Sequence, residues 1–514
     1  MINNKFLKST ICVIFFTVLS RITGFIRDSV MANYLGAGYV SDALVAAAKL
    51  PNSFRRLLAE GALSSTFVPM FSKSLSENKK HNAIIFASRI FFTLMLILLV
   101  IFVIFNLFMP FFVNLLSPGF KAVPEKLNLT VNLSRINFIF LITISLTALC
   151  GGILNSINKF SYFAATPIIL NLGIVIAIIF SKDSTDVQIA YIISWTTIIM
   201  GFVQLILMMY GCKTNKLGIV ATKPKMDHKM RLFLKKMSFG FIGSGIYQIN
   251  IFVDTIFASL TTSGVSYLYY TDRVNQLPLT LIGGTLGIVL LPTISKYIKS
   301  KEFDKLFKLQ DSCIVFGMYA SAFCVASIFA FNKEITKFIY FRGKFSMNDV
   351  DVVRTMLMIF SIGLPFSILS KILTAHIFAN GDTKTPMKIG MYCMIINVII
   401  NFASFKYLGY YCVVAATIIS SVFSGLIPFF HLRKHKLLKI NTSMSLKIAC
   451  IIIIGMATYL LQIHLIKYLS YFITNEKISL MLAILFSGGF YILSSFITKI
   501  YSIQELMQIV KKNH

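Results

Sequence analysis

The sequence predicts an all-α polytopic membrane protein with about fourteen transmembrane helices, arranged as two parallel six-helix repeats plus two extra C-terminal helices. Three observations predict this fold class. The chain of 514 residues is 56% hydrophobic, whereas soluble domains are roughly 45–50% apolar. The apolar residues form runs of about 20, which is the length of a spanning helix. The basic residues lie mostly in the short gaps between these runs.

Six segments form the first predicted repeat. The first follows Lys5 and Lys8, and no A-x-A-like cleavage site appears after it, so we expect a retained helix rather than a signal peptide. The second contains Pro51, where we expect the helix to be interrupted. The six ranges are roughly 9–34, 41–72, 83–116, 128–156, 161–181 and 187–211.

Six further segments repeat features of the first six. Pro51 and Pro69 in the second segment are matched by Pro278 and Pro292 in the eighth. Because six spans return the chain to its starting side, the halves are predicted to be parallel repeats, and transporters commonly hold their substrate between such halves. These ranges are roughly 232–260, 264–295, 306–331, 349–379, 386–405 and 409–431.

Two final segments, roughly 445–466 and 478–498, lie outside the repeat. Lys and Arg are concentrated in alternate connections, which places both termini in the cytoplasm by the positive-inside rule. The predicted parts are an N-terminal lobe (1–212), a basic cytoplasmic linker (213–231), a C-terminal lobe (232–434), the two extra helices (445–498) and a cytoplasmic tail (499–514).

The composition also excludes several functions. A net charge of +30 often indicates nucleic-acid binding, but here the basic residues follow membrane topology, so no nucleic-acid partner is expected. The eight cysteines form no CxxC motif, and no zinc spacing, nucleophile–base triad or nucleotide-binding fingerprint appears. We therefore expect a transporter, not an enzyme, driven by an ion gradient, the membrane potential or the substrate gradient.

Charged residues inside the first two segments are the strongest functional signal. A charge at the bilayer centre costs about 2.5–3.5 kcal/mol on insertion scales, so it needs a reason. Arg21 and Asp28 are seven residues apart and share a helix face, so we expect Asp28 to hold the Arg21 guanidinium in the empty site. Basic groups outnumber acidic ones, which predicts a wet, positive cavity that binds an anion. The candidate residues are Arg21, Arg27, Asp28, Asp42, Arg55, Arg56, Glu60 and Arg273.

Two alternatives stay open for these features. Charged residues near predicted helix ends, Asp42 among them, can form structural ion pairs or reach the membrane interface instead. Proline and glycine in the second and eighth segments predict places where these helices bend during transport, although static kinks are the alternative. The predicted hinge residues are Pro51, Pro278, Gly283, Gly284 and Gly287.

A second, weaker polar group lies in the C-terminal half. It consists of Asp254 near the middle of the seventh segment, Asn397 and Asn401 one turn apart, and Thr417. A carboxylate with amide and hydroxyl oxygens suits a sodium ion or a proton. The alternative is hydrogen bonding between helices.

The chain resembles the MurJ (MviN) family of lipid II flippases, within the multidrug/oligosaccharidyl-lipid/polysaccharide exporters. The resemblance is carried by SRITGFIRD, KLPNSFRRLLAEGALSSTFVP, YYTDRVNQLP, FRGKF and GDTKTPMK. It implies a flippase of the bacterial cytoplasmic (inner) membrane that moves lipid II to the outer leaflet for peptidoglycan biosynthesis by alternating access. Lipid II and membrane lipids are the expected partners, and we expect a monomer. The rival functions are export of another lipid-linked glycan, of the O-antigen or teichoic-acid type, and cation-coupled drug antiport.

The resemblance also assigns roles to individual residues. The family's cavity arginines fall on Arg21, Arg27, Arg55 and Arg273, and its cavity acids and serine fall on Asp28, Asp42, Glu60 and Ser266. The two extra helices would shape a groove for the lipid tail. A sodium site, with Na⁺ as a coupling ion, would fall on Asp254, Asn397, Asn401, the Val413 carbonyl and Thr417. Asn401 replaces the acidic residue expected there, which removes one negative charge from the site.

Overall fold

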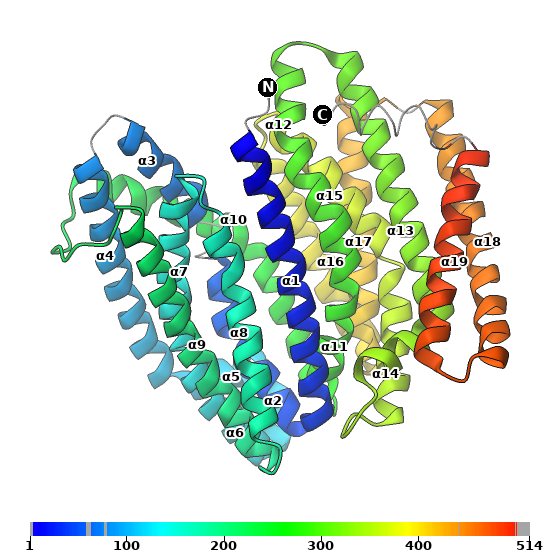
Figure 1. The fold of residues 1–514 in the computed structure, drawn as a ribbon, viewed down its shortest axis with the longest axis horizontal. Coiled ribbons are helices and arrows are strands. Elements are labelled where there is room, and N and C mark those ends of the chain that lie inside the picture. Colours follow the sequence, from blue (N-terminus) through cyan, green and yellow to red (C-terminus); the bar gives the residue numbers. More distant parts are fainter. Residues whose placement is uncertain (1–3, 58–62, 77–79, 440, 499, 501–514) are drawn as a thin grey trace. The chain divides into compact units, whose positions relative to one another are not determined.

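The computed structural model describes residues 4–57, 63–76, 80–439, 441–498 and 500, and the regular elements in these ranges are helices (Figure 1). The predicted tail 499–514, apart from residue 500, lies outside the described residues. The helices divide between two compact units. The first comprises Met1–Ser266 and Arg342–Ser346, and the second comprises Tyr267–Phe341 and Met347–His514.

Local side-chain bonds set where several helices of the first unit begin. Thr185 and Gln188 form a capping box at the start of α9, and Asp227 accepts the backbone N–H of Met230 at the start of α10. The helices of this unit are α1 (Asn4–Leu35), α2 (Tyr39–Arg55), α3 (Ser64–Ser76), α4 (Lys80–Leu107), α5 (Met109–Leu116), the 3-10 turn η2 (Pro118–Ala122), α6 (Pro124–Asn137), α7 (Phe140–Asn155), α8 (Ser161–Phe180), α9 (Asp186–Thr214) and α10 (His228–Ser259).

The core of the first unit is an aromatic and aliphatic cluster between α3, α4 and α7. Phe67 and Phe71 stack with ring centroids 5.3 Å apart, and both are fully buried together with Ile90 and Leu149. Beside this core, α1 packs along α8, and α2 packs along α6. These two helix pairs carry Arg21, Arg27, Asp28, Asp42 and Lys126.

A short segment from much later in the chain, Arg342–Ser346, docks on the C-terminal end of α1. The backbone N–H of Lys344 donates to the Asn33 carbonyl at 2.9 Å, and its ammonium group pairs with Asp186. Gly36 and Gly343 have φ of +61° and +54°, and a Cβ at either position would collide with the opposing backbone. Two glycines therefore permit this close backbone contact.

The second unit contains a long helix, α13, on which the last two helices pack. Tyr319 of α13 and Tyr491 of α19 stack with centroids 4.4 Å apart, and each hydroxyl donates to the other residue's carbonyl. The elements of this unit are α11 (Gly264–Pro278), which begins in the first unit, the π segment η3 (Leu279–Gly284), α12 (Thr285–Lys299), α13 (Phe303–Tyr340), α14 (Met347–Ser361), α15 (Leu364–Ala379), α16 (Lys384–Leu408), α17 (Tyr411–Lys434), α18 (Thr442–Phe472) and α19 (Glu476–Ile497).

The helical, multi-pass architecture expected from the sequence is confirmed. Among the described residues, nine helices are long and apolar enough to cross a membrane, and the bent pair α14 and α15 raises the number to ten. The count of fourteen spans and the lobes 1–212 and 232–434 stay predictions. The compact units follow packing instead, and they group α10 with the first unit.

Candidate functional site

An arginine–aspartate pair lies on α1. Nε and Nη2 of Arg27 donate to the same carboxylate oxygen of Asp28, at 3.0 and 2.7 Å. The Asp28 side chain is only 2% exposed, whereas that of Arg27 is 15% exposed. The pairing of Asp28 with Arg21 stays a prediction, and the structure brings the adjacent Arg27 to this carboxylate. Adjacent residues point in different directions from a helix, so this contact depends on the length of the arginine side chain.

Asn171 on α8 holds the same guanidinium from a second helix. Its Oδ1 accepts Nη1 of Arg27 at 3.1 Å, while its Nδ2 donates to the Ser20 carbonyl at 3.2 Å and lies 3.3 Å from the Thr23 hydroxyl. The sequence reasoning missed Asn171. The available signal was an amide in the middle of the apolar run SYFAATPIILNLGIVIAIIF, since intramembrane polar residues tend to be functional.

Asp42 is completely buried and joins three parts of the first unit. Nζ of Lys126, on α6, lies 2.5 Å from its Oδ2. The Ser266 backbone N–H donates to Oδ1 at 2.7 Å, and the Ser266 hydroxyl makes a short bond to the same oxygen. The expected cavity residues Asp42 and Ser266 therefore meet, but both have no exposed surface here. Lys126 was missed because it lies before the predicted segment 128–156, two residues after Pro124, where the sequence indicated a connection.

The other basic candidates of the first unit lie at the places the sequence indicated. Arg21 is half-buried on α1, before Arg27. Arg55 is the last residue of α2, and Arg56 follows in a π-helical turn with Leu57. Glu60 lies outside the described residues, so its expected place among the cavity acids stays a prediction.

Arg273 belongs to the second unit, where it lies on α11. Its guanidinium carbon is 5.0 Å from the ring centroid of Tyr269, and Nη2 is 3.3 Å from the Tyr269 hydroxyl. The neighbouring Asp272 accepts Nε2 of Gln276 one turn later, at 2.5 Å. The tyrosine ring thus supports the guanidinium through a favourable cation–π contact.

Of the two helix breaks predicted at prolines, the structure has the one at Pro278 and not the one at Pro51. Pro51 lies inside α2, which continues to Arg55, so the interruption expected at Pro51 is wrong. The α-helical geometry changes to π at Arg56 and Leu57 instead. At Pro278 the expectation holds, because α11 ends there and η3 follows, containing Gly283 and Gly284. Gly287 lies in the next helix, α12.

Four of the five candidate sodium ligands form a hydrogen-bonded network between α16 and α17. Nδ2 of Asn401 donates to Oδ1 of Asn397 at 3.0 Å, and Nδ2 of Asn397 lies 3.5 Å from the Thr417 hydroxyl. Thr417 in turn donates to the Val413 carbonyl at 2.8 Å. Each oxygen that would ligate a cation here accepts a hydrogen from a neighbour.

The sodium site stays a prediction, because its fifth predicted ligand, Asp254, belongs to the other compact unit. The four candidate ligands in the second unit include no carboxylate, since position 401 is an asparagine, and the predicted carboxylate, Asp254, lies on α10 of the first unit. A hard cation prefers oxygen ligands that carry charge and are not already taken by N–H donors. No group of three or more His, Cys, Asp or Glu side chains that could hold a metal ion occurs in the described part of the chain.

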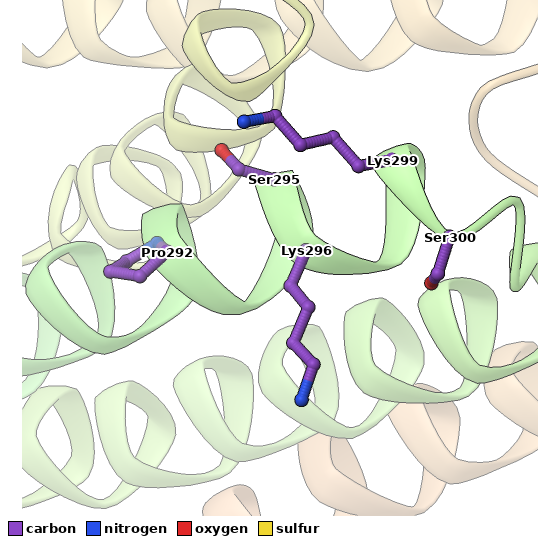
Figure 2. Close-up of a pocket in the computed structure, with 5 residues that line it drawn as sticks. All are labelled: Pro292, Ser295, Lys296, Lys299 and Ser300. Atoms are coloured by element: carbon purple, nitrogen blue, oxygen red, sulfur yellow. The ribbon is translucent and has the colours of Figure 1, made fainter.

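A shallow pocket opens at the C-terminal end of α12. It has a volume of about 480 Å³ and is lined by Pro292, Ser295, Lys296, Lys299 and Ser300. Figure 2 shows Lys299 reaching over Ser295, whereas Lys296 points to the opposite side of the helix. Since all the lining residues come from one helix end and the two ammonium groups diverge, the pocket provides no enclosed binding site.

Comparison with known proteins places this geometry in context. Residues 31–482 match the family model described as "Lipid II flippase MurJ". A protein of Rickettsia prowazekii named "Probable lipid II flippase MurJ" is 36% identical over 468 residues, covering 90% of this chain and 91% of the relative. A solved structure of lipid II flippase MurJ in an inward closed conformation is 26% identical, with a TM-score of 0.79 over 95% of this chain and 98% of that one. An inward-facing multidrug MATE transporter shares the fold at 14% identity, with a TM-score of 0.69 over 81% of this chain and 94% of that one.

Proposed function

The chain belongs to the lipid II flippase MurJ family, and from this premise we propose how it carries lipid II across the bacterial cytoplasmic membrane. It is a multi-pass transporter and not an enzyme. Lipid II combines an anionic pyrophosphate, a polar sugar–peptide head and a long hydrocarbon tail. These parts need a cationic site, a wet path and a lipid-like surface, respectively.

The position of Arg27 is the observation that supports the first requirement, a cationic site for the pyrophosphate. Its guanidinium is partly exposed and is held in one orientation by Asp28 and Asn171. Arginine presents a planar set of donors that matches phosphate oxygens in two-pronged bonds. We infer that Arg27 binds the pyrophosphate, and that Arg21, Arg55, Arg56 and Arg273 supply further positive charge.

Alternating access requires contacts that break when the head group leaves. With both termini in the cytoplasm, the C-terminal end of α1 and the start of α2 face outward. Asp42, Lys126 and Ser266 gather at this end, as does the docked segment Arg342–Ser346. We propose that these contacts hold the outer side closed while lipid II binds from the inside.

The bending points of the cycle are proposed to lie where helical geometry is already irregular. η3 breaks the run of α11 and α12 directly after Pro278, and the π turn at Arg56 and Leu57 follows α2. π segments interrupt the regular hydrogen-bond ladder and are frequent at functional sites. Pro278, Gly283 and Gly284 lie at η3, and Gly287 and Pro51 lie in the helices next to these two points; all five remain the proposed hinge residues.

The tail is proposed to stay in lipid along α18 and α19. Both helices carry large apolar side chains that are more than half exposed, including Ile453 and Met456 on α18 and Leu485 and Leu493 on α19. An apolar surface of this kind suits hydrocarbon rather than water. The proposal is for a monomer with about fourteen spans, and Na⁺ stays the candidate coupling ion.

The test is rescue of a bacterium depleted of its own flippase, with lipid II head-group exposure at the outer leaflet as readout. We expect Arg27→Ala and Arg273→Ala to fail. We expect Arg27→Lys to rescue only partly, because it keeps the charge and loses the planar fork. Arg231→Ala, at an exposed position on α10, is the matched control and should rescue. Full rescue by both cavity variants at normal protein levels would overturn the proposal, as would exposure of another lipid-linked glycan in place of lipid II.

A further inference from the structure

We propose that Asn171 is a positioning residue that makes the Arg27 site selective for anions: it fixes the guanidinium with a neutral acceptor and so leaves its charge available. This inference rests on the proposed function of Arg27. It adds a residue on α8 to a site that sequence reasoning confined to α1, α2 and α11.

The first step is the geometry of the guanidinium. The Asp28 carboxylate accepts hydrogen bonds from Nε and Nη2 of Arg27, and the Asn171 amide oxygen accepts one from Nη1. Because the two acceptors reach different nitrogens, the plane of the guanidinium cannot turn without breaking one of these bonds. Because its plane is already fixed, the guanidinium loses less conformational entropy when a phosphate binds, which is the general benefit of preorganisation.

The second step is that Asn171 is itself held in one orientation. Its side chain is 6% exposed, and its Nδ2 reaches both the Ser20 carbonyl and the Thr23 hydroxyl. The Thr23 hydroxyl donates to Ser20 at 3.1 Å, so its oxygen can accept from Asn171. The nitrogen of the amide therefore faces α1 acceptors, and its oxygen is left to face Arg27.

The third step is charge. Arg27 and Asp28 together carry no net formal charge, and Asn171 adds none. A carboxylate of the same shape at position 171 would still accept from Arg27, but it would make the group negative. Charges are weakly screened in a partly buried site, so this change would oppose a pyrophosphate and favour a cation. An amide gives orientation without that penalty.

The experiment uses the full-length protein in nanodiscs and measures lipid II affinity across a pH series. The variants Asn171→Asp and Asn171→Leu are both close to asparagine in size. The matched controls are Asn106→Asp and Asn106→Leu, because Asn106 on α4 donates only within its own helix, to the Phe102 carbonyl. Thermal melting of each variant reports whether it folds.

We expect Asn171→Asp to weaken lipid II binding by about tenfold or more at neutral pH, the scale of opposing one charge-assisted hydrogen bond. Binding should recover as the pH falls, because protonation removes the new charge. Asn171→Leu should weaken binding with no such recovery, and the Asn106 variants should bind normally. In the double variant Asp28→Asn/Asn171→Asp the net charge is restored, so binding should exceed that of Asn171→Asp alone.

Wild-type affinity in Asn171→Asp would overturn the inference. So would equal losses in Asn171→Asp and Asn171→Leu without pH recovery, since they would reduce Asn171 to a packing role. Arg27→Ala separates this outcome from failure of the proposed function. If Arg27→Ala loses binding while Asn171→Asp does not, only the role of Asn171 fails; if Arg27→Ala binds normally, the anion site itself is wrong.

Discussion

Lys126 and Asp42 form a buried ion pair in which Nζ lies 2.5 Å from Oδ2, with side chains 8% and 0% exposed. The pair joins α6 to α2, and the Ser266 hydroxyl and N–H bond to the other carboxylate oxygen. The ammonium also lies 4.0 Å from the centre of the Phe120 ring. Two charges this deeply buried are stable only as a satisfied set.

The first prediction is that either charge without the other is strongly destabilising. Lys126→Met and Asp42→Asn should each cost about 3–5 kcal/mol, because each leaves one buried charge unpaired. The double variant should recover much of the loss, measured as the melting temperature of the purified protein. Lys337→Met is the control, because its pair with Glu476 is exposed and contributes less than about 1 kcal/mol. A double variant no more stable than either single one would contradict this account.

The second prediction concerns the docking of Arg342–Ser346 on α1. Gly343→Ala should release the segment, because the new Cβ would meet the Asn33 carbonyl. Hydrogen exchange of the Lys344 amide, which donates to Asn33, is the measurement, and it should become faster. Gly409→Ala is a matched control, since Gly409 has the same φ of +54° with nothing within 4 Å of the added atom. Lys344→Ala should change this exchange little, because its pair with Asp186 is at the surface. If Gly343→Ala and Gly409→Ala speeded up exchange of the Lys344 amide equally, the cause would be backbone strain from alanine at positive φ and not the collision with Asn33.

The third prediction is that Gly284→Ala stabilises the protein and slows transport. A Cβ at this position meets only Thr280 Cγ2, at 3.8 Å, so it fits. Alanine favours a regular helix over glycine by about 1 kcal/mol, which opposes bending at η3. The rate of lipid II exposure in single-turnover flipping should fall while the melting temperature rises. Gly245→Ala, inside α10 with open space around it, should stabilise without slowing. An unchanged rate in Gly284→Ala would remove the case for a hinge at η3.

The fourth prediction is a pH dependence at the start of α16. Oδ1 of Asp382 accepts the backbone N–H groups of Lys384 and Thr385, both at 2.9 Å. Hydrogen bonds from the Thr385 side chain and backbone, followed by that of Lys384, lower the pKa of Asp382. Since the folded-state pKa is depressed, the stabilisation is present above the unfolded value and is lost as the pH falls through the folded one. Asp382→Asn keeps an acceptor oxygen but loses the negative charge near the helix N-terminus, so it should be less stable by roughly 0.3–1 kcal/mol at neutral pH, and this difference should shrink below about pH 4. A difference in melting temperature that is constant with pH would exclude this role.

Much of the fold was predictable because each apolar run must bury its backbone polar groups in a helix to cross lipid. The charged candidates were also predictable, since an arginine such as Arg27 stands out in an apolar run. Asn171 and Lys126 were not recognised, because an uncharged amide carries little signal and a lysine near a helix start suggests an interface. The contact between Arg27 and Asp28 was not recognised, because helical phase describes where side chains leave the backbone, not where a long arginine ends.

The sequence by itself determined the helical class, the membrane setting and the positions of the arginines, because these follow from local hydropathy and residue type. The family resemblance, not the charge, supplied the name of the substrate. Only the tertiary structure decided which side chains each charged group contacts. It buries Asp42 against Lys126 and Ser266, holds Arg27 between Asp28 and Asn171, and fills the oxygens between α16 and α17 with N–H and O–H donors. The pairings of Asp42 with Lys126 and Ser266, and of Arg27 with Asn171, join residues far apart in the chain, and only packing between helices sets their distances.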